Sequence, residues 1–534
     1  MVRLVGAWVL VNGLLLAPSW IVAGVFDTPF AWLSVEATVL VGAMALLPAR
    51  PWARVLAWVV GGAVVLLAMA LVANLVFEQS LGRALDLSLD LYLLDAVYRL
   101  AVGNLGRTIT WLAIVGAVGV GTACVAGLGW LLSPLRGDSV EEGWFTPARV
   151  GSGFVVVGIV LGVAGFGLPS VVARAPAPAL AFVYRQSLEF GARREERATF
   201  FADLQNEPAL PAPPALLGRL EGRAVVLAYV ESYGMAALDD PQFASVVRPL
   251  LDSAQGRLDA AGIHQVTGSF VSPTLGGQSW YAHGTMLSGL WLENQLRYEL
   301  LLTSERETLV DDFRRAGYRT ATVMPAITTP WPEAVRIGYD EVHTAQSMPY
   351  AGPPLYWVTM PDQFTWSFMG ALLRDATGPV FIEAGMVSSH APWTPIVPLV
   401  EWDDVGDGSV FEAQRMEGDP PEEAWWDVDI LRSGYAHSLA YSLESMLQFT
   451  ERYLDERTLL IVAGDHQAAP WVTGSSSPNV PVHVMARDAA LLEPFEELGF
   501  VRGAFPDASQ AVHRMDEFRT WFVGAYSGSE APQR

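Results

Sequence analysis

The chain has 534 residues, of which 51% are hydrophobic and only 17% are charged, and its formal net charge is −23. This composition is too apolar for a soluble protein of that length, so it predicts a membrane portion joined to a globular one. The acidic balance excludes nucleic acid as a partner, because a phosphate backbone requires a basic face. All basic residues are Arg, and the single cysteine, Cys124, excludes an intrachain disulfide.

Five apolar segments in the first 172 residues are each long enough to cross a bilayer, which takes roughly 20 helical residues. They are Leu4–Phe26, Phe30–Leu47, Arg54–Phe77, Thr108–Leu132 and Val150–Pro169. The first segment lacks a clear small-x-small cleavage site, and other spans follow it closely. We therefore interpret it as a retained span rather than a signal peptide.

The arginines predict the orientation of these spans. Those that flank loops on one side are Arg3, Arg50, Arg54, Arg136 and Arg149. The turn at Asp27–Pro29, on the other side, has no basic residue. The positive-inside rule places the N-terminus in the cytoplasm, and an odd number of spans then places everything after about residue 170 outside.

The segment "LGRALDLSLDLYLLDAVYRLAVGNLG" lies between the third and fourth spans and contains Asp86, Asp90 and Asp95. Leu and Tyr alternate with these acids, which predicts an amphipathic helix at the outer interface. A sixth span would bury the three aspartates at about 2.5–3.5 kcal/mol each, so we favour the interface. Glu36, inside the second span, is either a functional acid or a hydrated side chain near the outer end, and we favour hydration.

Residues 173–221 predict an amphipathic, Arg/Glu-rich helix and then a Pro-rich linker, which is typical of a joint between domains. Residues 222–534 alternate helical runs with short apolar, β-branched runs. The apolar runs are "RAVVLAYVES", "YRTATVMPA", "GPVFIEAGMVSSH", "RTLLIVAGDHQ" and "VPVHVMARD". The alternation predicts an extracytoplasmic α/β domain with a doubly wound, mostly parallel sheet buried on both faces.

Polar side chains follow several of these predicted strands. Glu231 follows "VVLAYV", His390 follows "VFIEAGMVSS", and Asp465 and His466 follow "LLIVAG". An acid there can be a helix cap, and a lone histidine is usually a satisfied surface or core residue. Because ligands bind beyond the carboxyl ends of parallel strands, the joint placement predicts a shared site.

The stretch "VSPTLGGQSWYAHGT" places Ser279 on a Gly-rich turn before a helix. Such a serine is either part of a surface loop or a nucleophile at a helix N-terminus, where N–H groups hold phosphoryl oxygens. One Asp, one Glu, one His and a hydroxyl oxygen suit a tetrahedral divalent cation. A cation on the Ser279 oxygen would favour its alkoxide near neutral pH.

The motifs "VLAYVES", "GGQSWYAHGTMLSGL", "SSHAPW" and "VAGDHQ" occur in this order after the apolar segments. In this the chain resembles the sulfatase-like branch of the alkaline phosphatase superfamily, most closely the lipoteichoic acid synthase type of membrane enzyme, which transfers phospholipid headgroups. The resemblance implies that Glu231, Ser279, Asp465 and His466 bind one divalent cation, Mn²⁺ or Zn²⁺. It also implies that Ser279 is the nucleophile and that His390 contacts the phosphate or the leaving group.

The chain departs from that family at several positions. The family nucleophile is usually Thr, and the acid that follows it is replaced here by the region of His283, which either faces the pocket or packs inside. Trp331 corresponds to the family's substrate-binding tryptophan, and Arg336 is the expected substitute for a missing companion arginine. No Cys lies near Ser279, so formylglycine cannot form, which counts against sulfate ester hydrolysis. His483 has the register of a strand interior, so we favour packing over ligation.

The segment Glu401–Asp429 contains eleven Asp or Glu residues and one Arg. Charge runs are usually solvated surface, which is the default interpretation. The resemblance instead places a loop near the pocket mouth here, where Trp425–Trp426 would meet lipid. A negative loop would disfavour a polyanionic acceptor and favour a neutral or cationic glycan or glycolipid.

The leading hypothesis is a metal-dependent phosphotransferase in the bacterial cytoplasmic membrane, with its catalytic domain outside the cytoplasm. It would move a phospholipid-derived headgroup, such as phosphoglycerol or phosphoethanolamine, through a covalent Ser279 intermediate onto an envelope glycan or lipid. The alternatives are a phosphodiesterase or phosphatase with water as the acceptor, and a catalytically inactive, membrane-anchored binding module.

We expect a reporter enzyme that works only outside the cytoplasm to be active when fused after Arg534, because the charge asymmetry places the C-terminal domain outside. The same reporter fused after Arg50, in a loop predicted to be cytoplasmic, serves as the control and should be inactive. The reverse pattern of activity would contradict the predicted topology.

Overall fold

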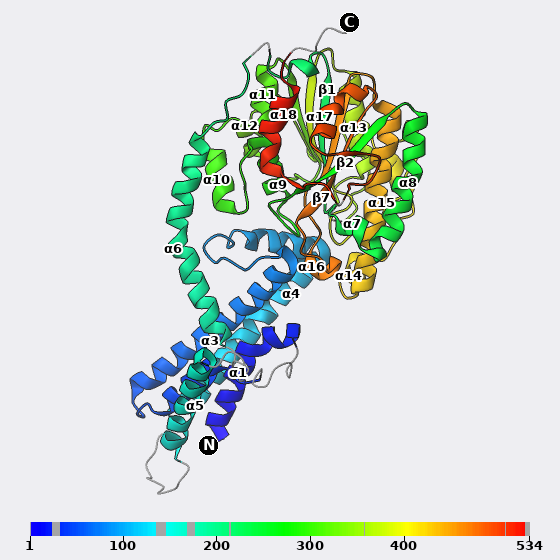
Figure 1. The fold of residues 1–534 in the computed structure, drawn as a ribbon. Coiled ribbons are helices and arrows are strands. Elements are labelled where there is room, and N and C mark those ends of the chain that lie inside the picture. The colour runs from blue at the N-terminus through cyan, green and yellow to red at the C-terminus, as the bar shows by residue number, and fades with distance from the viewer. Residues whose placement is uncertain are drawn as a thin grey trace. The chain divides into compact units, whose positions relative to one another are not determined.

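A computed structural model of the chain describes residues 2–23, 32–134, 146–167, 177–212, 215–356, 358–507 and 509–528. Figure 1 shows the order of the elements along the chain. The chain divides into two compact units. The first consists of Met1–Glu78 and Arg83–Arg194, and the second of Gln79–Gly82 and Glu195–Arg534.

The first unit is helical. Its helices are α1 (Val2–Ala23), α2 (Val35–Ala45), α3 (Pro51–Leu81), α4 (Leu93–Leu132), α5 (Pro147–Gly167) and the first part of α6 (Pro178–Gln205). Three described helical stretches are long and apolar enough to cross a membrane, namely Val2–Ile21, Pro51–Leu81 and Leu105–Leu132. Val35–Ala45 and Ala148–Gly162 are shorter apolar helices at the second and fifth predicted spans.

The count of five spans therefore stays a prediction. Part of the evidence for it, the turn at Asp27–Pro29 and Arg136, lies outside the described residues. Glu36 accepts hydrogen bonds from the backbone N–H groups of Ala179 (2.7 Å) and Leu180 (3.2 Å), in the first turn of α6. This acid thus caps a helix N-terminus rather than being only hydrated.

The prediction of one amphipathic helix through the segment after α3 is wrong in its first part. Residues 82–92 form turns, the helix starts at Leu93, and its backbone breaks at Gly106 (φ 77°, ψ 156°). Asp86 accepts from the N–H of Ser88, and Asp90 forms an ion pair with Arg83 at 2.7 Å. Aspartates that bond to nearby groups in this way compete with helical hydrogen bonding, and this accounts for the turns.

The second unit is an α/β domain, as predicted. Its described sheet has the order β4-β3-β5-β1-β6-β7-β2-β8, and β9 pairs with β2. The strands are β1 (Ala224–Val230), β2 (His264–Val271), β3 (Arg319–Met324), β4 (Glu341–Thr344), β5 (Val380–Gly385), β6 (Thr458–Gly464), β7 (Asn479–Ala486), β8 (Val501–Arg502) and β9 (His513–Arg514). The neighbouring pairs among β4, β3, β5, β1 and β6 are parallel.

The sheet is mostly parallel, as predicted: five strand pairs of the described sheet are parallel and three are antiparallel. The run "VPVHVMARD" belongs to its antiparallel part. That run forms β7, which is antiparallel to both β6 and β2. A parallel return needs a crossover of a dozen or more residues, usually with a helix. The connection from β6 to β7 contains only the one-turn helix α16 (Pro470–Thr473), so the chain returns in the opposite direction.

Helices cover both faces of the sheet (Figure 1). α8 (Pro241–Ala260), α13 (Asp362–Arg374) and α15 (Val428–Tyr453) pack in the apolar core of one face. α9 (Ser279–Ser288), α11 (Leu309–Arg315) and α18 (Phe518–Tyr526) pack in the core of the other. Alternate residues of β1 enter the two cores, since Val226 belongs to one and Val225 to the other. Burial on both faces explains the continuous apolar run of this strand.

Further helices connect these layers. They are η1 (Gly218–Leu220), α7 (Ala236–Asp239), α10 (Gln295–Thr303), α12 (Pro332–Ile337), η2 (Trp402–Asp404), η3 (Ser409–Ala413), α14 (Pro421–Ala424), η4 (Ala489–Leu491), α17 (Glu493–Glu497) and η5 (Met515–Glu517). A fully buried ion pair joins two of the packed helices: Arg519 of α18 donates to Asp312 of α11, with Nε 2.8 Å from Oδ2.

We expect Asp312→Ala to destabilise the protein by about 3–5 kcal/mol, because the guanidinium of Arg519 would remain buried without its carboxylate. Asp403→Ala is the matched control: it removes an exposed ion pair with Arg452 and should cost less than about 1 kcal/mol. Thermal unfolding of the detergent-solubilised chain measures both. Equal melting temperatures for the two variants would show that the buried pair does not support the packing of α11 against α18.

Candidate metal centre and nucleophile

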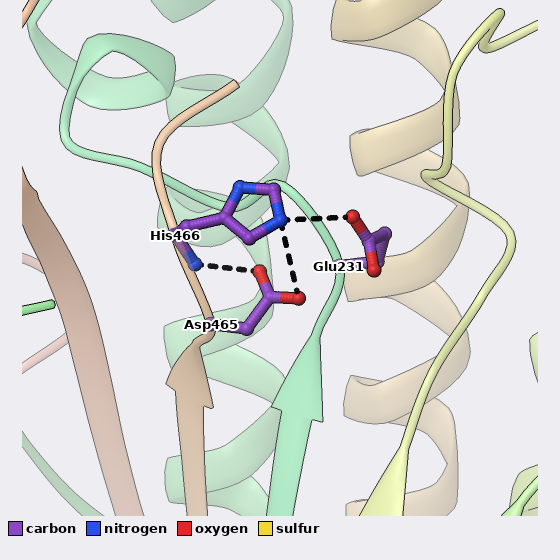
Figure 2. A group of neighbouring side chains, drawn as sticks. All are labelled: Glu231, Asp465 and His466. Carbon is purple, nitrogen blue, oxygen red and sulfur yellow. Dashed lines mark hydrogen bonds and ion pairs between the residues drawn. The ribbon is translucent and has the colours of Figure 1, made fainter. Parts of the chain in front are cut away.

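Three side chains meet at the carboxyl edge of the parallel strands. Glu231 is the first residue after β1, and Asp465 and His466 are the first two after β6. The two strands pair in parallel with Val230 opposite Gly464, so their ends are adjacent. Potential ligand atoms of the three residues all lie within 4.8 Å of one another. Figure 2 shows the imidazole of His466 pointing toward both carboxylates.

The hydrogen bonds of Asp465 and His466 leave one atom of each of these two side chains turned toward the cluster. Asp465 Oδ1 accepts from the backbone N–H of Ser232 (2.8 Å) and of His466 (2.6 Å). His466 Nδ1 lies 3.0 Å from the carbonyl of Gln467. Its Nε2 is buried without a hydrogen bond, 3.2 Å from Glu231 Oε1 and 3.7 Å from Asp465 Oδ2.

This arrangement fits a divalent cation. When Nδ1 donates its proton to the Gln467 carbonyl, Nε2 presents a lone pair to two carboxylates, and a cation or a proton must lie between these groups. One nitrogen and two carboxylate oxygens are a donor set that both Zn²⁺ and Mn²⁺ accept. A fourth position remains for an oxygen nearby.

The pKa values of His466, Glu231 and Asp465 indicate that the cluster holds a proton when it does not hold a cation. Burial opposes the charged form of His466, but the carboxylates of Asp465 and Glu231 raise its pKa to about 9. Burial also opposes ionisation of Glu231, yet His466 and His390 hold the pKa of this carboxyl below its usual range. Burial and the charge of Glu231 raise the pKa of Asp465. Cation binding would therefore displace a proton from the cluster.

Ser279 supplies an oxygen beside this cluster. It is the first residue of α9 and follows three residues with left-handed backbone, Gly276 (φ 71°), Gly277 (φ 149°) and Gln278 (φ 64°). Two of these are glycines, which adopt positive φ at no steric cost. The turn directs the Ser279 hydroxyl to Glu231, where it donates to Oε2 at 3.2 Å. Ser279 thus lies at the N-terminal end of α9, where free N–H groups attract anions.

Hydroxyl groups that the sequence did not single out hold the strand ends in place. Ser389 Oγ donates to the carbonyl of Glu231 at 2.7 Å, and Ser272 Oγ donates to the carbonyl of Asp465 at 2.6 Å. Tyr435 of α15 donates to the carbonyl of Ser232 at 2.9 Å. The position of Ser389 directly before His390 is a sequence signal that could have identified it as a residue of the site. Tyr435 lies in a helical run that carries no such signal.

The other predicted site residues lie in different surroundings. His390, after β5, acts on the pKa of Glu231 and so lies within electrostatic range of the cluster. His283 is partly buried on α9, where its ring stacks on Tyr229 with the ring centroids 3.9 Å apart, and it lies within electrostatic range of Glu231 and His466. His483 lies inside β7, fully buried, with its Nε2 3.0 Å from the Tyr233 hydroxyl.

Trp331 directly precedes α12, and Arg336 lies in the last turn of this helix. Trp331 packs against the apolar core beside α9, and Arg336 donates to the carbonyl of Leu302 at 2.9 Å. Within the described ranges, no hydrogen bond or ion pair links either residue to Glu231, Asp465 or His466. Their role in substrate binding stays a prediction.

No family model and no curated protein matches the sequence. Among solved structures, the chain is similar to the lipoteichoic acid synthase LtaP from Listeria monocytogenes, with 12% identity, 62% of this chain and 78% of that chain covered, and a TM-score of 0.39. It is also similar to the integral membrane lipooligosaccharide phosphoethanolamine transferase A (EptA) from Neisseria meningitidis, with 13% identity, 98% and 94% covered, and a TM-score of 0.48. A third match is the Streptococcus pyogenes phosphoglycerol transferase GacH in complex with sn-glycerol-1-phosphate, with 12% identity, 64% and 86% covered, and a TM-score of 0.37.

These three proteins are enzymes of the kinds that the sequence motifs resemble. At such low identities and TM-scores, however, the matches carry no conclusion about the activity of this chain. The chemistry assigned to it rests on its own residues.

We expect Asp465→Ala and His466→Ala to lose most of the bound cation, because each removes one of three inward-facing ligand atoms. Elemental analysis of the purified chain measures this loss directly. His437→Ala is the matched control, since His437 is an exposed histidine of α15 bonded to the carbonyl of Ser433. Stoichiometric metal in the Asp465→Ala protein would place the cation elsewhere.

Proposed function

We propose that this protein is a metal-dependent phosphotransferase that acts on phospholipid headgroups. The observation that carries the proposal is the Ser279 hydroxyl, 3.2 Å from Glu231 at the edge of a cluster that fits a divalent cation. A hydroxyl beside a cation and at a helix N-terminus combines a nucleophile with donors for a phosphoryl group. The same arrangement is too specific for a catalytically inactive binding module.

Glu231, Asp465 and His466 would hold the cation, with the Ser279 oxygen as a further ligand. When bound, the cation supplies positive charge that lowers the pKa of the Ser279 hydroxyl and of phosphate oxygens near it. The N–H groups of the first turn of α9 would orient the phosphoryl oxygens. His390 would donate a proton at the leaving oxygen, and its electrostatic influence on Glu231 supports this role.

The reaction proceeds in two displacements. In the first, the Ser279 hydroxyl loses its proton, Oγ forms a bond to phosphorus, and the bond from phosphorus to the diacylglycerol oxygen breaks. That oxygen takes a proton and diacylglycerol leaves. In the second, a hydroxyl of an envelope glycan or lipid attacks the same phosphorus, and the Ser279 oxygen is released and reprotonated.

The apolar helices of the first unit support a lipid donor, because they would keep the enzyme in the bilayer that contains it. We propose five spans with the catalytic domain outside the cytoplasm of a bacterial cell. Phosphoglycerol and phosphoethanolamine are the headgroup candidates, and Mn²⁺ and Zn²⁺ the cation candidates. Trp426, which is 87% exposed, lies in the acidic segment Glu401–Asp429. This segment favours a neutral or cationic acceptor over a polyanion.

We expect mass spectrometry of the protein incubated with a phospholipid donor alone to find a phosphodiester on the peptide that contains Ser279. Ser279→Ala should lack the adduct, and Ser279→Thr should keep part of the activity because Thr offers the same oxygen. Ser245→Ala, an exposed serine of α8, is the control and should behave as the wild type. An unmodified Ser279 in a protein that releases diacylglycerol would contradict the mechanism.

The fate of the adduct separates a transferase from a hydrolase. In a transferase, the adduct should persist until a glycan or lipid hydroxyl arrives, because the pocket disfavours attack by water. We therefore expect added acceptor to accelerate the loss of the adduct. Equal rates of loss with and without acceptor would identify a hydrolase instead.

A further inference from the structure

A carboxyl group lies buried in the core beside the nucleophile helix. Glu383 is in the middle of β5, is 1% exposed, and is in register with Leu227 of β1 and Thr322 of β3. Its Oε2 accepts a hydrogen bond from the hydroxyl of Tyr339, but its Oε1 has no hydrogen bond. Burying an acid with an unmade acceptor is costly, so an apolar residue would suit packing better at this position.

The free oxygen of Glu383 faces the nucleophile helix. Oε1 lies 3.7 Å from Nδ1 of His283, which follows Ser279 by one helical turn on α9. The other side of the imidazole stacks on Tyr229 with an interplanar angle of 14°. The ring is thus held between the carboxyl of β5 and the aromatic side chain of β1.

Two contacts therefore fix α9 along β1. Ser279 touches Glu231, and one turn later His283 touches Tyr229, which precedes Glu231 by two residues. One helical turn rises about 5.4 Å and two strand residues about 6.6 Å, so the two spacings nearly match. Any group that fixes the imidazole of His283 also fixes the position of the Ser279 hydroxyl over Glu231.

Glu383 is the member of this group whose charge changes near neutral pH. Burial, against the hydrogen bond from Tyr339, raises its pKa to about 7. Burial lowers the pKa of His283 to about 3, although the charge of Glu231 opposes this shift. The tyrosines that face Glu383 from the neighbouring elements, Tyr229, Tyr339 and Tyr298, all have raised pKa values because of burial and stay neutral. Thr322, from β3, does not titrate.

We propose that Glu383 is a positioning residue that acts on Ser279 through His283. When ionised, Glu383 attracts the Nδ1–H of the imidazole across the 3.7 Å that separates the two atoms, which favours this tautomer and steadies the ring against Tyr229. Because the carboxylate is buried, this attraction is stronger than it would be in water. When Glu383 is protonated, the hold on the ring is weaker, and α9 is less firmly seated. This inference rests on the proposed role of Ser279 as the nucleophile.

The test is the pH dependence of turnover by the metal-loaded full-length chain in detergent. The probe is bis(p-nitrophenyl) phosphate, a diester that reports the step at Ser279 whichever lipid is the natural donor. For the wild type we expect kcat to rise as pH increases through about 7, because Glu383 ionises there. Glu383→Gln should give a kcat without this rise, about tenfold below the wild type at pH 8 and similar to it at pH 6. KM and metal content should not change.

A second variant moves the transition instead of removing it. Tyr339→Phe deletes the hydroxyl that donates to the Glu383 carboxylate, so the pKa of Glu383 should increase and the rise in kcat should shift to higher pH. Glu341→Gln is the control: this acid of β4, which β3 separates from β5, pairs with Arg319 and should leave the profile unchanged.

A loss of kcat in Glu383→Gln that is equal at all pH values would mean that the carboxyl has only a structural role, and the proposal would be wrong. A wild-type profile retained in Glu383→Gln would also overturn it. A different result would show that the proposed function is wrong while the role of Glu383 is right. In that case the diester is cleaved with the expected pH profile, while phosphatidylglycerol and phosphatidylethanolamine release no diacylglycerol.

Discussion

The site depends on the parallel pairing of β1 with β6. Because Val230 lies opposite Gly464, the residue that leaves β1 and the two that leave β6 emerge side by side. The sheet thereby brings Glu231 within 4.8 Å of Asp465 and His466, although more than 200 positions separate it from them in the sequence. Two carboxylates that converge in a buried place repel each other unless positive charge lies between them. A divalent cation would satisfy this requirement and, in the proposed mechanism, would activate the hydroxyl of Ser279.

The layers around the sheet serve the same arrangement. The short turn with left-handed backbone before α9 brings the Ser279 hydroxyl to Glu231, and the hydroxyls of Ser389 and Ser272 donate to the carbonyls of Glu231 and Asp465 at the two strand ends. Below the first turn of α9, the helix is seated on Tyr229 by His283 and backed by Glu383. Ser279, the proposed nucleophile, is therefore positioned by a helix and two strands, which would suit a reaction that depends on alignment with phosphorus.

Much of this could be predicted from the sequence because the signals are local. Apolar, β-branched runs that end in Glu231 or in Asp465 and His466 identify strands and their polar ends, and the rule for parallel sheets brings those ends together. The Gly-Gly turn before Ser279 is likewise a local signal. The sequence pattern does not predict the direction of β7, because this direction depends on how the chain turns between β6 and β7. The turns at residues 82–92 were missed because Asp90 pairs with Arg83 only in the folded chain.

The role of Glu383 was beyond prediction for a different reason. In the run "GPVFIEAGMVSSH" it reads as a polar interruption of a strand, and its partners His283 and Tyr339 lie 100 and 44 positions away. His283 itself was recognised as unusual, but whether it faces the pocket or the core depends on how α9 is rotated against β1. Such contacts between distant segments are a property of the tertiary packing, and no local pattern encodes them.

The central claim is that Glu231, Asp465 and His466 hold a cation beside the hydroxyl of Ser279. Anomalous X-ray diffraction from crystals of the full-length protein grown with Zn²⁺ or Mn²⁺ tests it most directly. The account predicts one strong anomalous peak at the carboxyl ends of β1 and β6, bonded to both carboxylates, to Nε2 of His466 and to Oγ of Ser279. A cation bound by other residues, with these four side chains in contact only with one another, would contradict the claim.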